Sequence, residues 1–183
     1  MKSRDQGITT YPIKRENVEE TFRLVREGTL KLRFLLDRAS DDDEAFQPLA
    51  RFLAKEPGTL VINPFALQSR AADKATLHLE FLTHGVQVPY TLIVSPYNDK
   101  REVELSLTEL AKLGRPFIIK PANTTGGGIG VVTGAETLKD VLEARQHHKN
   151  DKYLLQETMK PAYLSENRAW FRIFYAFGDI IPC

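Results

Sequence analysis

The chain has 183 residues, of which 42% are hydrophobic and 27% charged, a composition typical of globular proteins rather than of disordered or fibrous ones. Its 25 basic and 24 acidic residues leave a net charge of +1, so neither nucleic acid nor a membrane surface is an expected partner. The single cysteine, Cys183, allows no disulfide within the chain, and no segment predicts a signal peptide or a membrane span. We expect a cytoplasmic protein of one or two small domains.

The first 70 residues follow the order helix, strand, helix, strand. After a loose arm that reaches Pro12, helical spacing predicts a helix from Asn17, a capping residue with Glu20 three positions on, to Gly28. Alternation over 30–36 predicts a strand with Leu30, Leu32, Phe34 and Leu36 on one face. A helix over 44–55, preceded by Ser40 and an acidic run, and a buried strand over 60–62 come next. This order predicts a parallel α/β unit.

The rest of the chain mixes short helices and strands. The expected helices cover 71–83, 108–113 and 136–148, and the expected strands cover 90–94, 117–120, 129–133, 153–157 and 170–177. A glycine turn between 117–120 and 129–133 predicts an antiparallel pair, and Gly178-Asp179 predicts a second hairpin turn. The aromatic residues of 170–177, beginning at Trp170, alternate as the core of their strand would.

The most informative segment joins a strand lysine to a run of glycines. Lys120 ends its predicted strand on the same face as Ile118, and Gly126, Gly127 and Gly128 follow it. Glycines accept positive φ and leave backbone N–H groups open to an anion, so this segment could fold over phosphates. The Walker pattern is excluded because the lysine precedes the glycines. A plain hairpin turn beside a surface lysine is the alternative.

Two further segments make the arrangement more specific. Asp73-Lys74 opens an earlier helix, and Gln156-Glu157 ends a later strand. Over 73–183 the order of these motifs resembles the ATP-grasp superfamily, nearest to carboxylate–amine ligases such as D-alanine:D-alanine ligase and the ribosomal-protein glutamate ligases. The resemblance implies a fold of mixed α/β and α+β class. A small α/β unit over 1–70 would precede an incomplete ATP-grasp fold over 71–183, whose first lobe ends near residue 152 and whose second lobe then begins.

The resemblance also implies residues that bind ATP. Lys74 and Lys120 would hold the α- and β-phosphates, and the backbone amides of the glycine flap would cover the β- and γ-phosphates. The adenine would meet the Glu157 carbonyl oxygen and the Met159 N–H. The remaining residues of the implied site are Gln156 beside the base, Ile118 as an apolar wall together with Met159, Glu166 for the ribose, and Gly126, Gly127, Gly128 and Ile129 in the flap.

One catalytic residue and a magnesium shell complete what the resemblance implies. Arg172 matches the family's arginine that meets the transferring phosphate, while an arginine reaching from an edge strand into solvent is the alternative. Family members hold magnesium with acidic groups and an asparagine on later strands, and only Asp179 follows Arg172 here. We assign no metal ligand within this chain and expect the Mg²⁺ ligands beyond residue 183, unless the protein is a degenerate relative.

Two functions remain open at this point. The first is an ATP-dependent ligase that joins a carboxylate to an amine through an acyl phosphate. The second is a nucleotide-binding or interaction module without turnover. A downstream magnesium shell would distinguish them.

Overall fold

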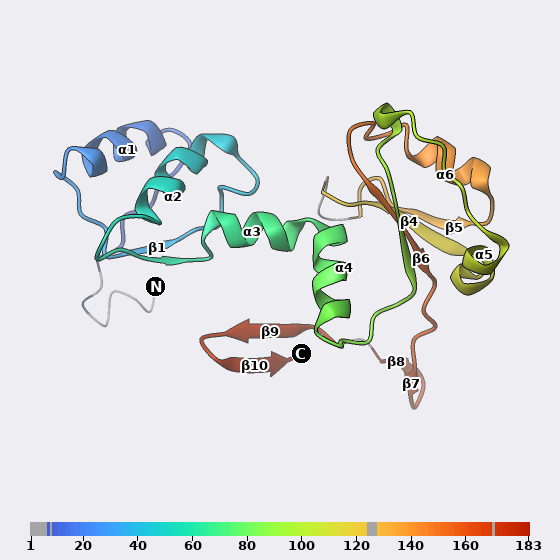
Figure 1. The fold of residues 1–183 in the computed structure, drawn as a ribbon. Helices are drawn as coiled ribbons and strands as arrows, with labels where there is room; N and C mark the ends of the chain where they lie inside the picture. The colour runs from blue at the N-terminus through green and yellow to red at the C-terminus, as the bar shows by residue number, and fades with distance from the viewer. Residues whose placement is uncertain (1–6, 8, 124–127, 170) are drawn as a thin grey trace. The chain divides into compact units, whose positions relative to one another are not determined.

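The structure is a computed structural model that describes residues 7, 9–123, 128–169 and 171–183. The chain divides into two compact units, Met1–Glu80 and Phe81–Cys183, each containing helices and strands (Figure 1). The domain boundary expected after residue 70 falls inside helix α3 (Phe65–Ala72), and this boundary stays a prediction. Among the described helices, none is long and apolar enough to cross a membrane.

The first unit is built on two parallel strands. β1 (Phe34–Leu36) pairs with β2 (Leu60–Ile62), and the connection between them carries the 3₁₀ helix η2 (Glu44–Phe46) and helix α2 (Gln47–Leu53). Helix α1 (Val18–Arg26) precedes β1, and it lies with α2 on one side of the strand pair (Figure 1). Parallel neighbours require such a crossover connection. The predicted parallel α/β unit is therefore confirmed.

The core of this unit lies between the helices and one face of the strands. Val18 of α1 and Leu49 and Leu53 of α2 form it, and Leu35 of β1 and Val61 of β2 pack against them. The face predicted for β1 is wrong, because Leu32 packs on the core whereas Phe34 and Leu36 are 61% and 63% exposed. The strand begins only at Phe34, so its alternation turns Leu35 toward the helices.

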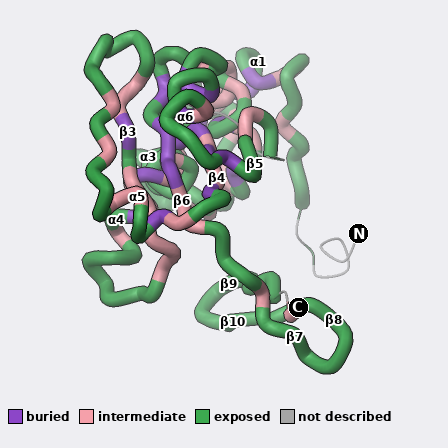
Figure 2. Tube along the Cα trace, turned by 90° about the vertical axis from the view of Figure 1, so that its right-hand side faces the viewer, coloured by how far each residue is buried: buried purple, intermediate pink, exposed green. Residues whose placement is uncertain are grey.

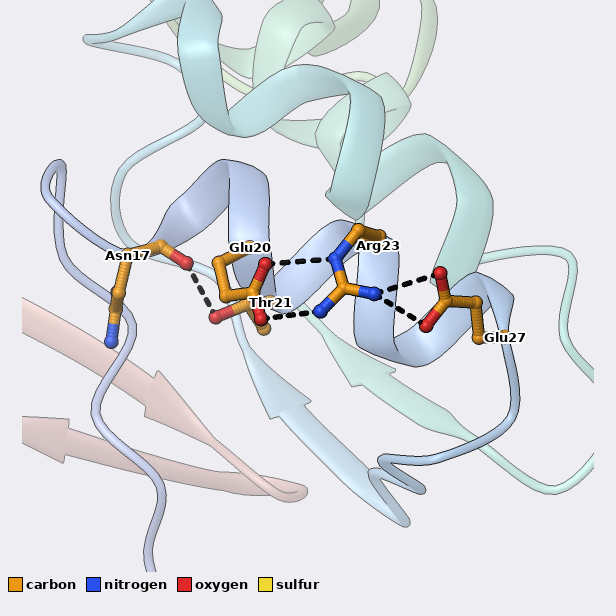
Figure 3. Close-up of polar contacts among 5 residues, drawn as sticks. All are labelled: Asn17, Glu20, Thr21, Arg23 and Glu27. Carbon is orange, nitrogen blue, oxygen red and sulfur yellow. Dashed lines mark hydrogen bonds and ion pairs between the residues drawn. The ribbon is translucent and has the colours of Figure 1, made fainter.

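Helix α1 carries ion pairs on its exposed side. Arg23 lies between Glu20 and Glu27 and donates to both oxygens of each carboxylate at 2.6–2.9 Å (Figure 3). The cap predicted from Asn17 and Glu20 is wrong. The Asn17 side chain makes no cap hydrogen bond, because its Oδ1 accepts from the Lys14 N–H at 2.6 Å. The Asn17 carbonyl oxygen instead accepts from the Thr21 hydroxyl at 2.7 Å.

The other helices of this part differ from the predicted ranges. The helix expected over 44–55 is divided between η2 and α2, and Asp43 caps η2 by accepting from the Ala45 N–H at 3.0 Å. The helix expected over 71–83 begins at Lys74 as α4 (Lys74–Thr83), after Asp73. Helix α3 was not predicted, because it buries no residue and so has no apolar stripe to recognise.

The second unit is an antiparallel sheet with the strand order β3-β6-β4-β5. These strands are β3 (Thr91–Val94), β6 (Tyr153–Glu157), β4 (Phe117–Pro121) and β5 (Val132–Ala135). Helices α5 (Leu107–Leu113) and α6 (Leu138–Ala144) cover one face of the sheet, and the 3₁₀ helix η3 (Tyr97–Asp99) follows β3 (Figure 1). The core under these helices includes Leu113, Phe117, Ile119, Val141, Tyr153 and Leu155. The predicted antiparallel pairing of the two strands that flank the glycines is confirmed.

Two sequence-based boundaries in this sheet need correction. Strand β6, expected to begin a second lobe, lies in the middle of the sheet between β3 and β4, so the sheet is not divided near residue 152. Strand β5 begins at Val132 rather than at residue 129. Gly128 and Gly130 have φ angles of 81° and 72°, and an extended strand excludes this left-handed backbone.

Two hairpins end the chain. β7 (Tyr163–Leu164) pairs with β8 (Asn167–Arg168), and β9 (Ile173–Ala176) pairs with β10 (Asp179–Pro182). The strand expected over 170–177 is shorter, and its residues do not form a core, since both strands of the last hairpin are exposed throughout (Figure 2). Trp170 lies outside the described residues. The turn consists of Phe177 and Gly178, because Asp179 already pairs with Ala176.

Candidate functional site

Lys120 lies on the face of the sheet opposite the helices. Along β4, Phe117, Ile119 and Pro121 are buried, whereas Ile118 and Lys120 between them are half-buried. Side chains of a strand alternate between its two faces, so burying one set beneath α5 and α6 directs the other set to the open face. The predicted shared face of Ile118 and Lys120 is therefore present, at the end of β4 that leads into the glycines.

Strand β6 places the predicted hinge beside this lysine. Gln156 lies directly opposite Ile118 in the strand register, on the same face of the sheet as Lys120. The Lys120 Nζ donates to the Gln156 Oε1 at 2.8 Å. A hydrogen bond from a charged donor is stronger than one between neutral groups. The structure thus brings together Ile118, Lys120 and Gln156.

A third strand extends this polar arrangement. The Gln156 Nε2 donates to the Thr91 Oγ1 at 3.0 Å, and the Thr91 hydroxyl donates to the Pro89 carbonyl oxygen at 3.0 Å. Thr91 lies directly opposite Gln156 in the pairing of β3 with β6. Sequence reasoning missed Thr91, because only the register between two distant strands reveals its position. These hydrogen bonds form one row across β4, β6 and β3.

The chain leaving β6 is tied to its surroundings by side-chain hydrogen bonds. The Glu157 Oε1 accepts from the Tyr90 N–H at 2.6 Å, and the Glu157 N–H donates to the Tyr90 carbonyl oxygen at 3.0 Å. The Thr158 hydroxyl donates to the Pro116 carbonyl oxygen at 2.7 Å. Met159 follows with 59% of its surface exposed. The Glu157 carboxylate therefore serves to hold the start of β3.

A buried carboxylate holds the chain where it enters the segment that contains Gly126, Gly127 and Gly128, called the glycine segment below. Asp151 accepts from the Asn123 N–H and from the Asn123 Nδ2, each at 2.9 Å. Residues 124–127 lie outside the described part of the chain, and with them the predicted phosphate contacts of Gly126 and Gly127. Asp151 was not predicted from the sequence. The pairing of β4 with β6 would have suggested it, because that pairing brings the end of one strand to the start of the other.

The exit from the glycine segment is a turn. The Val131 N–H donates to the Gly128 carbonyl oxygen at 3.2 Å, and Ile129, predicted to contact phosphate, is exposed within this turn. A β-carbon added at Gly130 would lie 3.4 Å from the His148 ring and 3.5 Å from Pro121. The close packing and the positive φ of Gly130 together explain a glycine at this position.

His148 connects this turn to a buried tyrosine. The Tyr153 hydroxyl accepts from the His148 N–H at 3.0 Å. Burial raises the pKa of Tyr153 above its ordinary value, because the anionic form would lose its hydration. Tyr153 therefore stays neutral at physiological pH and acts as a packing residue.

Three residues of the predicted ATP site lie outside strands β3, β4 and β6. Lys74 is the first residue of α4, within the first unit. Glu166 is exposed in the turn between β7 and β8. Arg172 is exposed and exchanges two backbone hydrogen bonds with Cys183, at 2.9 and 2.8 Å, which extend the last hairpin.

Acidic side chains are the usual protein ligands of magnesium. Within the described ranges, no group of three or more histidine, cysteine, aspartate or glutamate side chains could hold a metal ion. Asp179, the acidic residue that follows Arg172, is exposed on β10.

Solved structures share this architecture. The D-alanine–D-alanine ligase from Bacillus anthracis matches 97% of this chain and 61% of its own, with a TM-score of 0.56 and 16% identity. The chain has an ATP-grasp fold. An ATP-grasp RimK domain protein from Sphaerobacter thermophilus matches 84% of this chain and 62% of its own, with a TM-score of 0.49 and 20% identity. The D-cycloserine synthetase DcsG matches 79% of this chain and 54% of its own, with a TM-score of 0.47 and 20% identity.

This chain spans between 53% and 62% of the length of the solved chains it matches. At 16% identity, the likeness to the Bacillus anthracis ligase establishes the fold and not the activity. No family model and no curated protein matches the sequence.

Proposed function

We propose that this ATP-grasp chain binds ATP as part of an ATP-dependent ligase that joins a carboxylate to an amine. The observation that carries the proposal is the 2.8 Å hydrogen bond between the Lys120 Nζ and the Gln156 Oε1. This donor lies beside the predicted hinge, on the open face of the sheet, in the strand that precedes the glycine segment. A cation with adjacent backbone amides is the arrangement that phosphate groups favour.

In this proposal the adenine meets the main chain of the hinge. The Glu157 carbonyl oxygen would receive the exocyclic amine of the base, while the Glu157 side chain accepts from the Tyr90 N–H. The Met159 N–H would donate to a ring nitrogen, and Ile118 and Met159 would provide apolar contact. Glu166 is the candidate for the ribose hydroxyls. Main-chain recognition distinguishes bases because each base presents its own donors and acceptors.

The proposed reaction begins when a substrate carboxylate oxygen attacks the γ-phosphorus of ATP. The bond from that phosphorus to the β–γ bridging oxygen breaks, which leaves ADP and an acyl phosphate. An amine then attacks the acyl carbon, phosphate leaves with the electron pair of the C–O bond, and the amine loses a proton to solvent. Lys74 and Lys120 would stabilise the phosphate charge, and Arg172 the transferring group.

The second candidate is a nucleotide-binding module without turnover. Asp179 is exposed on β10 opposite Ala176, and no residue of this chain is assigned to magnesium in either candidate. Both candidates require ATP binding, and only the ligase releases ADP. ADP release in the presence of ATP, magnesium and mixtures of amino acids would establish the ligase, whereas ATP binding without ADP release fits both candidates.

Calorimetric titration with ATP and magnesium tests the binding itself. Lys120→Ala should weaken ATP binding about tenfold or more, the usual size of a lost hydrogen bond to a charged group. The matched control is Lys149→Ala, which removes an exposed lysine whose side chain lies over the Tyr97 ring, and it should leave the affinity unchanged. An unmodified chain that does not bind ATP, or two variants of equal affinity, would contradict the proposal.

A further inference from the structure

The row of hydrogen bonds across the open face has one possible direction. The Lys120 ammonium group can only donate, and the Pro89 carbonyl oxygen can only accept. The Gln156 oxygen must therefore face Lys120, at 2.8 Å, and its NH₂ group must face the Thr91 oxygen, at 3.0 Å. The Thr91 hydroxyl proton is then directed to the Pro89 oxygen, also at 3.0 Å. Both ends of the row determine every proton position between them.

We propose that Thr91 and Gln156 are positioning residues that orient the Lys120 ammonium group toward an anionic ligand. This inference rests on the proposed function, because it concerns the lysine assigned to phosphate. A lysine side chain loses much rotamer freedom when it binds a ligand. Holding Lys120 in place before the ligand arrives reduces that loss, and so raises affinity without a new contact.

The chemistry of Gln156 suits this role better than a carboxylate would. Its amide is neutral, so the hydrogen bond orients the ammonium group without cancelling its charge. A glutamate at this position would form an ion pair with Lys120 and compete with a phosphate group for it. Thr91 completes the arrangement, because it holds the Gln156 amide from the adjacent strand.

Thr91→Val is the sharpest test, since valine keeps the shape of threonine and suits a strand. Gln156 is also expected beside the base, whereas Thr91 acts through Gln156. We expect Thr91→Val to weaken ATP binding about threefold, the effect of losing one modest hydrogen bond. Affinity for adenosine, which lacks phosphates, should change less than the affinity for ATP does. Thr91→Ser should restore ATP affinity, and Thr108→Val, an exposed threonine of α5, is the matched control.

A double-mutant cycle separates positioning from general damage to the sheet. In a Lys120→Met background, Thr91→Val should have no further effect on ATP affinity, because the group it orients is absent. Gln156→Glu should weaken ATP binding more than Thr91→Val does. Calorimetric titrations of each folded variant with ATP and with adenosine give the affinities that the cycle compares.

The outcomes of these titrations separate the phosphate role of Lys120 from the positioning role of Thr91. If Lys120→Met leaves ATP affinity unchanged, the phosphate role of Lys120 is wrong, and with it the proposed function. If Lys120→Met weakens ATP binding but Thr91→Val does not, only the positioning role is overturned. An equal loss of adenosine and ATP affinity in Thr91→Val, or a full effect in the Lys120→Met background, would also overturn it.

Discussion

The carboxylate of Asp151 accepts two hydrogen bonds from Asn123, one from its N–H and one from its Nδ2, each at 2.9 Å. Asp151 is 6% exposed and precedes β6, while Asn123 follows β4. The Ala122 N–H donates to the Lys152 carbonyl oxygen at 2.9 Å beside them. Asp151 therefore continues the pairing of β4 with β6 to the point where the chain enters the glycine segment.

Asp151→Ala should lower the free energy of unfolding by about 1–3 kcal/mol, because it removes the acceptor for two donors of Asn123. Urea unfolding followed by circular dichroism measures this change. Asp99→Ala, at an exposed position in η3, is the control and should cost less than about 0.5 kcal/mol. Equal losses in both variants would show that the Asn123 contacts are not stabilising.

Arg145→Met should destabilise the second unit by about 2 kcal/mol, a typical cost of leaving buried acceptors unpaired. Arg145 is 2% exposed, and its guanidinium group donates to the Ser95 and Pro96 carbonyl oxygens at 2.9 Å each and so holds the chain after β3. Arg101→Met, at an exposed position, should change stability little. Thermal and urea unfolding of both variants provide the comparison, and an Arg145→Met protein as stable as Arg101→Met would refute this role.

Asp140 should make the stability of α6 sensitive to acid. The Glu136 N–H, the Thr137 hydroxyl and the Thr137 N–H donate to its carboxylate and lower the pKa of Asp140 below its ordinary value of 3.8. The stabilisation is present above the unfolded-state pKa and is lost as the pH falls through the lower folded-state pKa. An NMR titration should give a midpoint below 3.8 for Asp140, and Asp140→Asn should remove this acid-dependent loss. A midpoint at or above the ordinary value would contradict the prediction.

Phe177→Asn should stabilise the last hairpin. Phe177 and Gly178 form its turn with φ angles of 53° and 101°, as in a type I′ turn, and Phe177 is 87% exposed. Asparagine followed by glycine is the preferred pair in such turns. Hydrogen exchange of the Arg172 amide, which bonds to the Cys183 carbonyl oxygen, should slow by about threefold. The same exchange rate in both proteins would contradict the predicted stabilisation of the turn.

Local patterns in the sequence determined the elements whose signals lie within a few residues. Hydrophobic periodicity predicts the alternation of β4 and the strands β1 and β2. The glycine at position 114 predicts the end of α5. The placement of Lys120 on an open strand face, in the strand that precedes the glycines, was predictable for the same reason. These features depend only on residues that are close together in the sequence.

The tertiary structure alone decided which residues surround that lysine. Thr91 meets Gln156, and Asp151 meets Asn123, because β6 pairs with both β3 and β4 although many residues separate them in the chain. The exposure of Phe34 was likewise set by which face the helices cover. Strand order and register depend on the summed packing of the whole sheet, and no local sequence pattern specifies that sum.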